Sequence, residues 1–487
     1  MKNREKFSSR LGFILISAGC AVGLGNVWRF PYITGLYGGA AFVILYLVFL
    51  AILGLPIMAM EFSIGRASQK SCAKSFDVLE PKQTKWHLIK YSSIAGNYLL
   101  MMFYTTIGGW MLNYCFKMAF GTFHNINSEE VSAVFSDMLD SPFQNIFWMV
   151  IISIIGFFIC SKGLQNGVEK ISKYMMSFLF IIMLVLVIRA VTLPNAVEGL
   201  KFYLVPDFHK MMENGFGNAI FAAMGQAFFT LSIGIGAMAI FGSYIGKERS
   251  LLGESLNICI LDTLIAFIAG LIIFPSCFSF GVDADSGPGL VFVTLSNVFN
   301  EMPGGQLWGT LFFLFMTFAA LTTIIAVFEN IISFAMDHGW SRKKAVIFNF
   351  ILILILSLPC ALGFYILSFI SPLGANTTIQ DFEDFIVSNN LLPLGSLLYL
   401  LFCTSRYGWG WKNFLQEVNT GKGLKFPNVL RFYATWILPV IVLFIFVQGY
   451  IEKFDAPWNF ILPILIVCCI LYIPLQAWYS IQKANKL

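Results

Sequence analysis

The sequence predicts an all-α integral membrane protein with twelve transmembrane helices. Hydrophobic residues make up 58% of the 487 residues, charged residues make up 12%, and the mean hydropathy is +0.77. A soluble chain would carry about twice that charged fraction. Apolar stretches of about 20 residues or more are read as bilayer-spanning helices. The predicted spans are 11–36, 40–65, 88–120, 143–161, 171–191, 217–245, 255–280, 306–336, 344–369, 379–404, 431–451 and 459–480.

The placement of the basic residues tests this map of spans. If the N-terminus is cytoplasmic, 25 of the 31 Lys and Arg residues fall on the cytoplasmic side and five on the other, with Arg29 left inside the first span. Cytoplasmic loops of membrane proteins carry such an excess of Lys and Arg. We therefore expect both termini to be cytoplasmic and the chain to lie in the inner (plasma) membrane of a bacterium. The net charge of +5 then needs no nucleic-acid partner.

Two spans contain breaks that a lipid-facing helix would not tolerate. Residues 19–31 read GCAVGLGNVWRFP inside span 1, and residues 230–237 read TLSIGIGA inside span 6. Backbone groups freed by such breaks are tolerated at membrane depth only where they are buried in protein or line a cavity. Interrupted spans at corresponding positions in two halves of a chain point to a ligand site near the bilayer midplane.

The five-span interval between the breaks predicts two five-helix repeats, spans 1–5 and 6–10, followed by two extra helices. The second repeat is inverted because an odd number of spans precedes it. We expect a cytoplasmic N-terminal segment at 1–10, the first repeat at 11–191, an extracellular loop at 192–216, and the second repeat at 217–404. A cytoplasmic loop, spans 11 and 12 and the C-terminus then occupy 405–487.

The sequence shows no sign of enzyme chemistry. The ten cysteines have neither zinc-like spacing nor a pair in an outer loop, and the four histidines are far apart along the chain. The motifs HExxH, GxSxG and GxxxxGK[ST] do not occur. We therefore expect neither enzymatic activity nor ATP-driven transport by this chain alone.

A set of short motifs resembles the neurotransmitter:sodium symporter family. The motifs are RLG at 10–12, AVGLGNVWRFP at 21–31, GGA at 38–40, Pro56, Glu61, GR at 65–66 and FFTLS at 228–232. The similarity runs from Arg4 to Asp384 and is weaker beyond. The resemblance implies a sodium-coupled secondary active symporter that imports an amino acid by alternating access between the two sides of the membrane.

The breaks offer groups that suit a free amino acid. The amides of Leu24 and Gly25 follow the first break, where the start of a half-helix favours a carboxylate. By resemblance, Tyr104 binds the same carboxylate, and the carbonyls of Ala21 and Phe229 with the Thr230 hydroxyl accept from the ammonium. The implied substrate pocket consists of Ala21, Leu24, Gly25, Leu100, Tyr104, Phe229, Thr230, Ser232, Ile235, Thr323 and Val327, with Ile324 beside them.

The side chains of this set predict the substrate class. Monoamine carriers of the family have an aspartate where this chain has Gly23. Gly23 leaves room for a ligand carboxylate, so the resemblance favours α-amino acids over amines. The remaining pocket is mostly apolar, so we expect a hydrophobic or aromatic L-amino acid.

Two sodium sites are implied by the resemblance, for one or two sodium ions. The first comprises Ala21, Asn26, Thr230 and Asp262, and the second Gly19, Val22, Ala319, Thr322 and Thr323. Unwound backbone supplies carbonyls that coordinate sodium. For the two threonines a second interpretation stays open, since Thr hydroxyls often bond the preceding turn of their own helix.

Asp262 departs from the family pattern, which usually has asparagine at this position. Animal members of the family bind chloride nearby. A carboxylate here could supply that negative charge, so we expect transport that does not need chloride. Buried intramembrane carboxylates are costly and usually functional; a structural acid bonded to a neighbouring hydroxyl is the alternative.

The resemblance also implies two gates. The outer gate comprises Arg29, Gln226 and Asp384, with Arg29 and Asp384 expected to pair; the inner gate comprises Arg4, Tyr244 and Asp337. Phe7 is expected to act as an apolar plug of the inner gate, and Glu61 to brace the unwound part of span 6.

Other functions stay open at this point. A proton-coupled amino-acid carrier of the same architecture and a non-transporting amino-acid receptor are the main alternatives, and a channel would need a continuous polar path. The expected partners are an amino acid, sodium ions and the lipid bilayer. Spans 11 and 12 are expected to contribute packing or contacts with a second copy in a homodimer.

Overall fold

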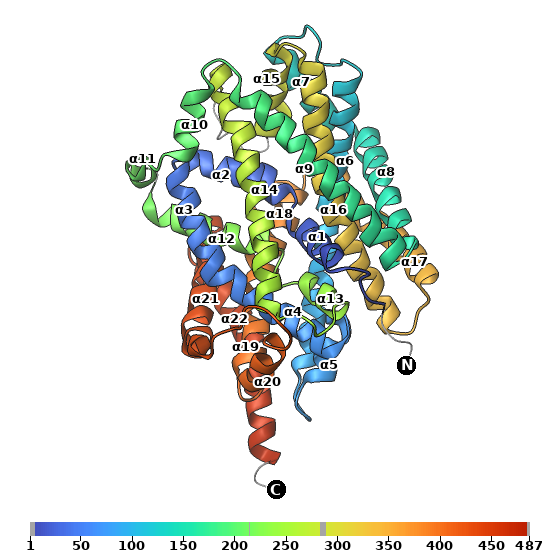
Figure 1. Cartoon of the computed structure of the whole chain (residues 1–487), viewed down its shortest axis with the longest axis vertical. Coiled ribbons are helices and arrows are strands. Elements are labelled where there is room, and N and C mark those ends of the chain that lie inside the picture. Colours follow the sequence, from blue (N-terminus) through green and yellow to red (C-terminus); the bar gives the residue numbers. More distant parts are fainter. Residues whose placement is uncertain (1–4, 214, 283–288, 485–487) are drawn as a thin grey trace.

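The computed structural model describes residues 5–213, 215–282 and 289–484, and it is almost entirely helical (Figure 1). The predicted spans correspond in order to α1, η1 and α2 (Arg10–Ala21, Gly25–Arg29, Phe30–Leu36); α3, η2 and α4 (Ala40–Phe49, Leu50–Gly54, Leu55–Ser68); α6 (Ile89–Ala119); α8 (Pro142–Ser161); η4 and α9 (Leu164–Glu169, Lys170–Val191); α12 and α13 (Phe216–Thr230, Ala237–Ser243); α14 (Leu251–Phe280); α16 (Gly305–Asp337); α17 (Arg342–Leu362); α18, η6 and α19 (Ile379–Asp384, Phe385–Leu391, Leu392–Thr404); η8 and α21 (Tyr433–Ile437, Leu438–Lys453); and α22 (Trp458–Ala484).

Shorter helices lie between these spans. They are α5 (Cys72–Leu79), η3 (Trp86–Leu88), α7 (Ser128–Leu139), α10 (Ala196–Leu204), α11 (Phe208–Glu213), η5 (Leu290–Thr294), α15 (Leu295–Glu301), α20 (Trp411–Val418) and η7 (Asn428–Leu430). One predicted boundary is wrong. The ninth predicted span reaches residue 369, but α17 ends at Leu362 and turns follow from Gly363.

Within the described residues, nine helices are long and apolar enough to cross a membrane, or ten if the bent pair of span 1 counts as one. Helix α6 does not qualify although it has 31 residues, because it carries many Ser, Thr, Asn, Tyr and Gly residues. Several of these polar side chains are buried inside the protein. Helices α12 and α13 have only 15 and 7 residues, and each is too short to cross alone. Helix α6 is therefore an exception because it lies in the interior, and α12 and α13 are exceptions because they are the two halves of a broken span.

Both predicted breaks are present. Helix α1 begins at its N-cap Ser9, whose hydroxyl accepts from Gly12 N at 3.1 Å, and it ends at Ala21. The chain then bends by 56° into the segment Gly25–Leu36. Six residues separate α12 from α13, and there Gly234 has φ +100°, a conformation that side chains other than glycine rarely adopt. The local sequence therefore breaks both helices where the glycines stand.

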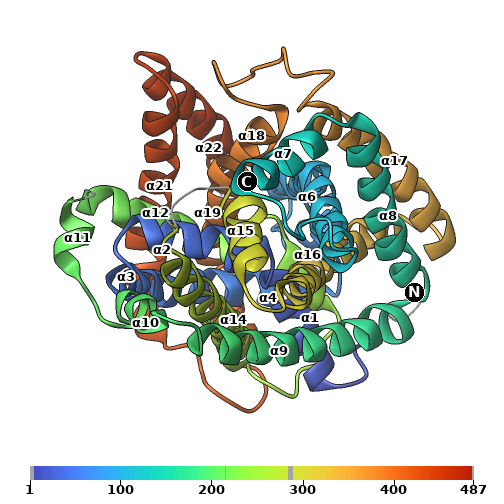
Figure 2. The ribbon, with the colours of Figure 1, turned by 90° about the horizontal axis from the view of Figure 1, so that it is seen from above.

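The two breaks lie at the centre of the bundle. Helix α1 packs against α16, which in turn packs along α6 (Figure 1). Seen from above, α21 and α22 lie at the edge of the molecule, away from α8 and α17 (Figure 2). The last two helices therefore add to the outside of a core formed by the first ten spans.

Candidate functional site

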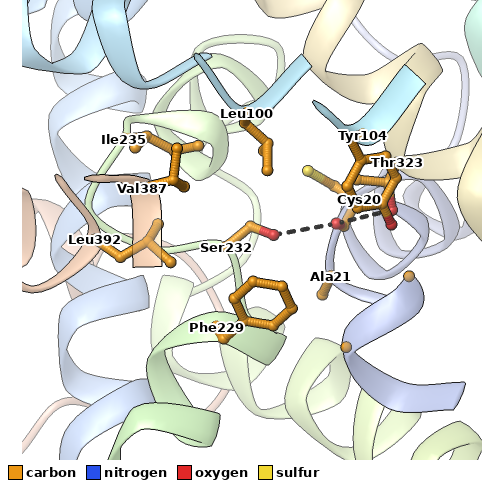
Figure 3. Close-up of a pocket in the computed structure, with 12 residues that line it drawn as sticks. Cys20, Ala21, Leu100, Tyr104, Phe229, Ser232, Ile235, Thr323, Val387 and Leu392 are labelled. Atoms are coloured by element: carbon orange, nitrogen blue, oxygen red, sulfur yellow. Dashed lines mark hydrogen bonds between the residues drawn. The ribbon is translucent and has the colours of Figure 1, made fainter. Parts of the chain in front are cut away.

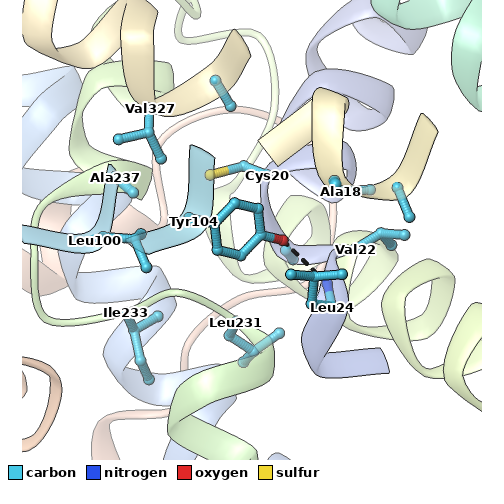
Figure 4. Close-up of a cluster of buried hydrophobic side chains, with 14 of the residues drawn as sticks. Ala18, Cys20, Val22, Leu24, Leu100, Tyr104, Leu231, Ile233, Ala237 and Val327 are labelled. Atoms are coloured by element: carbon cyan, nitrogen blue, oxygen red, sulfur yellow. Dashed lines mark hydrogen bonds between the residues drawn. The ribbon is translucent and has the colours of Figure 1, made fainter. Parts of the chain in front are cut away.

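The first break turns one backbone amide toward a buried tyrosine and another toward Asn26. Leu24 N donates to Tyr104 Oη at 3.0 Å, and Gly23 N donates to Asn26 Oδ1 at 3.1 Å (Figure 4). A Cβ atom on Gly23 would lie 2.3 Å from Tyr104 Oη and 2.7 Å from Thr323 Oγ1. Only glycine leaves room for this approach, so Gly23 keeps a polar end of the site open.

Asp262 joins the two breaks. Asn26 Nδ2 donates to Asp262 Oδ1 at 2.8 Å, and Thr230 Oγ1 donates to Asp262 Oδ2 at 2.9 Å. All three side chains are buried, and none of the ion pairs between described residues includes Asp262. A buried carboxylate is costly unless hydrogen bonds and a positive charge compensate it. Three of the four residues predicted for the first sodium site therefore meet around one negative charge, and Ala21 lines the adjacent cavity.

Oxygen atoms also converge around Thr323. Its Oγ1 lies 3.3 Å from Gly19 O, 3.2 Å from Val22 O and 3.5 Å from Ala319 O. Thr322 Oγ1 donates to Ala319 O at 2.9 Å. The residues predicted for the second sodium site are thus brought together, and the bond of Thr322 to its own helix is also formed. Closely set carbonyl and hydroxyl oxygens are the ligands that a hard cation takes.

A small cavity opens between the breaks (Figure 3). It is lined by Cys20, Ala21, Gly23, Gly25, Leu100, Tyr104, Phe229, Ser232, Ile235, Thr323, Val387 and Leu392. Tyr104 and Thr323 lie at one end, and Ile235, Val387 and Leu392 lie at the other (Figure 3). The cavity therefore has one polar end and an apolar remainder.

Most residues of the predicted pocket line this cavity, but four do not. Leu24 contributes its backbone amide, and the Thr230 hydroxyl faces Asp262. Val327 belongs to the buried apolar cluster behind Tyr104 and Leu100 (Figure 4). Ile324 packs toward Gly108 instead. These residues support the cavity from outside. The prediction included them because position along a helix alone does not settle which side chains of a turn point inward.

Three lining residues were not predicted. Cys20 directly precedes Ala21, and the Cys20 carbonyl accepts from Ser232 Oγ at 3.4 Å. Val387 and Leu392 come from span 10, to which sequence analysis assigned only Asp384. The polar run Ser388–Asn390, followed by Pro393, was a detectable sign of irregular helix there, and η6 covers that run.

Glu61 braces the second break, as predicted. Its carboxylate accepts from Gly234 N and, at 3.3 Å, from Met238 N. Gly234 lies in the interrupted part of span 6 and Met238 in the first turn of α13, where backbone amides have no acceptor within the helix. On the first break, Gln226 Nε2 donates to Gly25 O at 2.9 Å. Gln226 therefore supports the backbone of the site.

The predicted pair of Arg29 and Asp384 is wrong for this structure. Arg29 Cζ lies 4.6 Å from the centroid of the Phe229 ring, and Asp384 Oδ1 accepts from Ser388 Oγ at 2.7 Å. Among described residues no ion pair joins Arg29 to Asp384. The guanidinium lies over a half-buried aromatic ring, while the carboxylate accepts a hydrogen bond within its own helical turn.

On the side of the N-terminus, Tyr244 and Asp337 each form hydrogen bonds with other described residues. Tyr244 Oη contacts Glu329 Oε1 at 3.0 Å and Ser333 Oγ at 2.7 Å. Asp337 Oδ2 accepts from Ser71 N at 2.8 Å and from Ser71 Oγ at 2.7 Å. Arg4 lies outside the described residues.

Phe7 packs edge-on against the Tyr244 ring at 5.6 Å between centroids. Two charged residues that sequence analysis missed lie beside this contact. Arg342 forms two bonds to the fully buried carboxylate of Glu329, at 2.7 and 2.9 Å. An aromatic contact and a buried ion pair therefore close this side together.

Known proteins share both the sequence and the fold. The model of the sodium:neurotransmitter symporter family matches residues 4–125 and 122–482. The chain is 33% identical over 446 residues to the uncharacterized sodium-dependent transporter YhdH of Bacillus subtilis, covering 91% of this chain and 97% of that protein. An uncharacterized sodium-dependent transporter of Haemophilus influenzae is 34% identical over 460 residues, with 92% and 98% covered.

A solved structure has the same fold across the bundle. The crystal structure of MhsT in complex with L-phenylalanine matches with a TM-score of 0.82 and 36% identity, covering 92% of this chain and 100% of that one. The family match runs through both breaks and all ten helices of the core. The chain therefore belongs to the sodium:neurotransmitter symporter family, and it is a sodium-coupled membrane transporter, not an enzyme.

Proposed function

We propose that this transporter imports a hydrophobic or aromatic L-amino acid together with sodium by alternating access. The observation that carries the proposal is the cavity between the breaks, which has one polar end and an otherwise apolar wall. The Leu24 amide and Tyr104 Oη suit a carboxylate, and Leu100, Phe229 and Ile235 suit an apolar side chain. The match to MhsT, solved with L-phenylalanine, supports the same substrate class.

Two sodium ions would bind beside this cavity. Asn26, Thr230 and the Asp262 carboxylate surround the first position, and the carbonyls around Thr323 surround the second. Ala21 borders both the cavity and the first position. Occupancy of one site then assembles part of the other, so sodium and substrate should raise each other's affinity. Each sodium charge moving inward gains about 2.3 kcal/mol per 100 mV of membrane potential.

Asp262 supports chloride-independent transport. Its carboxylate is buried at the junction of the breaks and would supply a negative charge next to the proposed first sodium ion. A sodium ion there would be balanced without a bound anion.

We further propose a cytoplasmic location of both termini in the inner (plasma) membrane of a bacterium. The charge bias of the loops supports this orientation. The C-terminal end of α22 and the segment before α1 both lie on the side of the molecule away from α7 and α15 (Figure 1). This arrangement agrees with two termini on the same side of the membrane. The exposed faces of α21 and α22 at the edge of the molecule leave room for a homodimer.

Uptake into proteoliposomes tests the proposal. Vesicles are given a mixture of amino acids with an inward sodium gradient or matched potassium, and their contents are read by mass spectrometry. We expect sodium-dependent enrichment of one hydrophobic or aromatic amino acid, unchanged when gluconate replaces chloride. Enrichment driven by a proton gradient without sodium would instead support a proton-coupled carrier. Sodium-dependent binding without uptake would support a receptor.

Asp262→Asn tests the role assigned to the carboxylate. The variant keeps the size of the side chain but removes its charge, so the sodium concentration needed for half-maximal uptake should rise about tenfold or more. Glu129→Gln, an exposed acid on α7, is the matched control and should leave it unchanged. An unchanged sodium requirement in Asp262→Asn would contradict the proposed first sodium site.

A further inference from the structure

A buried carboxylate at the start of span 5 binds the segment that precedes α1. Glu169 accepts from Ser8 N at 2.8 Å, from Ser8 Oγ at 2.6 Å and from Ser9 Oγ at 3.2 Å. Lys173 Nζ, one turn further on α9, contacts Glu169 Oε1 at 2.8 Å and Ser9 Oγ at 2.7 Å. Glu169 is only 1% exposed. The carboxylate is therefore committed to partners 160 or more residues earlier in the chain.

Gly12 allows this approach. A Cβ atom on Gly12 would lie 2.0 Å from Glu169 Oε1. The Gly12 amide also donates to Ser9 Oγ, the N-cap of α1. The start of α1 can therefore approach the Glu169 carboxylate closely because Gly12 has no side chain.

Further contacts fasten the same segment on the N-terminal side of Ser8. Leu164 N donates to Glu5 Oε2 at 3.1 Å, and Gln165 Nε2 donates to Lys6 O at 2.8 Å. Phe7 lies between these contacts and Ser8, and its ring packs on Tyr244 of the second repeat. Residues 5–9, which we call the latch segment, therefore lie between span 5 and the end of α13.

We propose that Glu169 is a positioning residue that holds the latch segment closed, so that its release from Glu169 is a required step in opening the N-terminal side. The inference rests on the alternating access proposed above. Helix α1 begins directly after the latch segment and carries Gly19, and the Gly19 and Val22 carbonyls face Thr323. Movement of the segment would therefore be transmitted to the proposed second sodium site, and sodium there should strengthen the latch.

Hydrogen exchange of the full chain in lipid nanodiscs tests the proposal. Exchange is measured in sodium without substrate, for peptides covering residues 5–13, 164–172 and the remaining helices. Removing bonds to a charged acceptor in Glu169→Ala should speed exchange of the first two peptides about tenfold or more. In Glu169→Gln, which keeps a hydrogen-bond acceptor without the charge, the exchange rates of these peptides should lie between those of Glu169→Ala and the wild type. Lys170→Ala, the neighbouring exposed position, is the matched control and should change nothing.

Gly12→Ala provides an independent variant. Alanine favours a helix over glycine, so faster exchange of the latch segment would come from its collision with Glu169. The effect should vanish in the Glu169→Ala background, because the two changes act on one contact. Unchanged exchange in Glu169→Ala, a uniform increase over all helices, or additive effects of the two changes would each overturn the inference. Uptake is measured separately, so a failure of the substrate assignment would not alter these readouts.

Discussion

The cavity is closed by very different structures on its two sides. On the side of Arg29, which we call the opposite face, the guanidinium lies 4.6 Å above the ring of Phe229, which lines the cavity. On the side of the latch segment, which we call the N-terminal face, Phe7 packs on Tyr244 and Arg342 pairs with buried Glu329. The contact of Arg29 with Phe229 involves two side chains, whereas the contacts on the N-terminal face join several helices.

The difference has energetic consequences. A cation–π contact contributes about 0.5–2 kcal/mol, whereas removing one partner of a buried ion pair costs about 3–5 kcal/mol. We therefore expect the opposite face to open by side-chain motion and the N-terminal face to open only when a segment of backbone moves.

The largest effect is expected on the N-terminal face, for Glu329→Gln. The variant leaves the Arg342 guanidinium without its buried partner and should lower the free energy of unfolding by about 3 kcal/mol. Thermal unfolding in detergent measures the loss. Glu5→Gln removes the exposed carboxylate 3.6 Å from the same guanidinium and should cost little. Equal losses of stability in Glu329→Gln and Glu5→Gln would contradict the view that the buried ion pair makes the N-terminal face the stronger closure.

The next effect concerns the site between the closures. In Gly23→Ala the added methyl group would lie 2.3 Å from Tyr104 Oη, and overpacking of this kind costs about 1–3 kcal/mol. Substrate binding in sodium should weaken about tenfold or more, as measured by scintillation proximity or calorimetry. Gly225→Ala, where an added Cβ meets nothing within 4 Å, is the control. Normal affinity in Gly23→Ala would contradict the assigned polar end.

A smaller effect is expected from Phe229→Leu, which removes the aromatic ring under Arg29 on the opposite face. Loss of about 1 kcal/mol from the cation–π contact should make a water-soluble maleimide modify Cys20 about fivefold faster. Cys20 is the reporter because it lines the cavity. Peptide mass spectrometry separates Cys20 from the other cysteines, and Phe382→Leu on α18 is the control. If Cys20 reacted no faster in Phe229→Leu, the contact of Arg29 with Phe229 would not limit access from the opposite face.

The smallest effect is expected from Ser388→Ala. The Asp384 carboxylate loses its bond to Ser388 and becomes available to Arg29. Because an ion pair near the surface contributes about 0–1 kcal/mol, modification of Cys20 should slow about twofold at most. Faster modification would show that the Ser388 bond itself supports the opposite face.

Much of the fold could be predicted from the sequence because its signals are local. Bilayer-length apolar stretches located the spans, and the glycines at 23, 25, 234 and 236 located both breaks. The end of α17 was predicted seven residues too far, since the apolar run 363–369 continues as turns without a change in composition.

The candidate site could be predicted only in part. Asn26, Thr230 and Asp262 belong to three separate spans, and family resemblance, not spacing, predicted that they meet. Val387 and Leu392 were missed because the polar run between them indicates an irregular helix but does not show which neighbouring side chains face the cavity.

The sequence by itself determined that this chain crosses a membrane through many helices, and where two of them must break. Apolar length and glycine conformation act within a few residues, so no distant partner is needed to infer them. Only the tertiary structure decided that Arg29 lies on Phe229, that Glu329 pairs with Arg342, and that Glu169 holds the latch segment. Long charged side chains can reach many partners, and the partner each one meets depends on how distant helices pack.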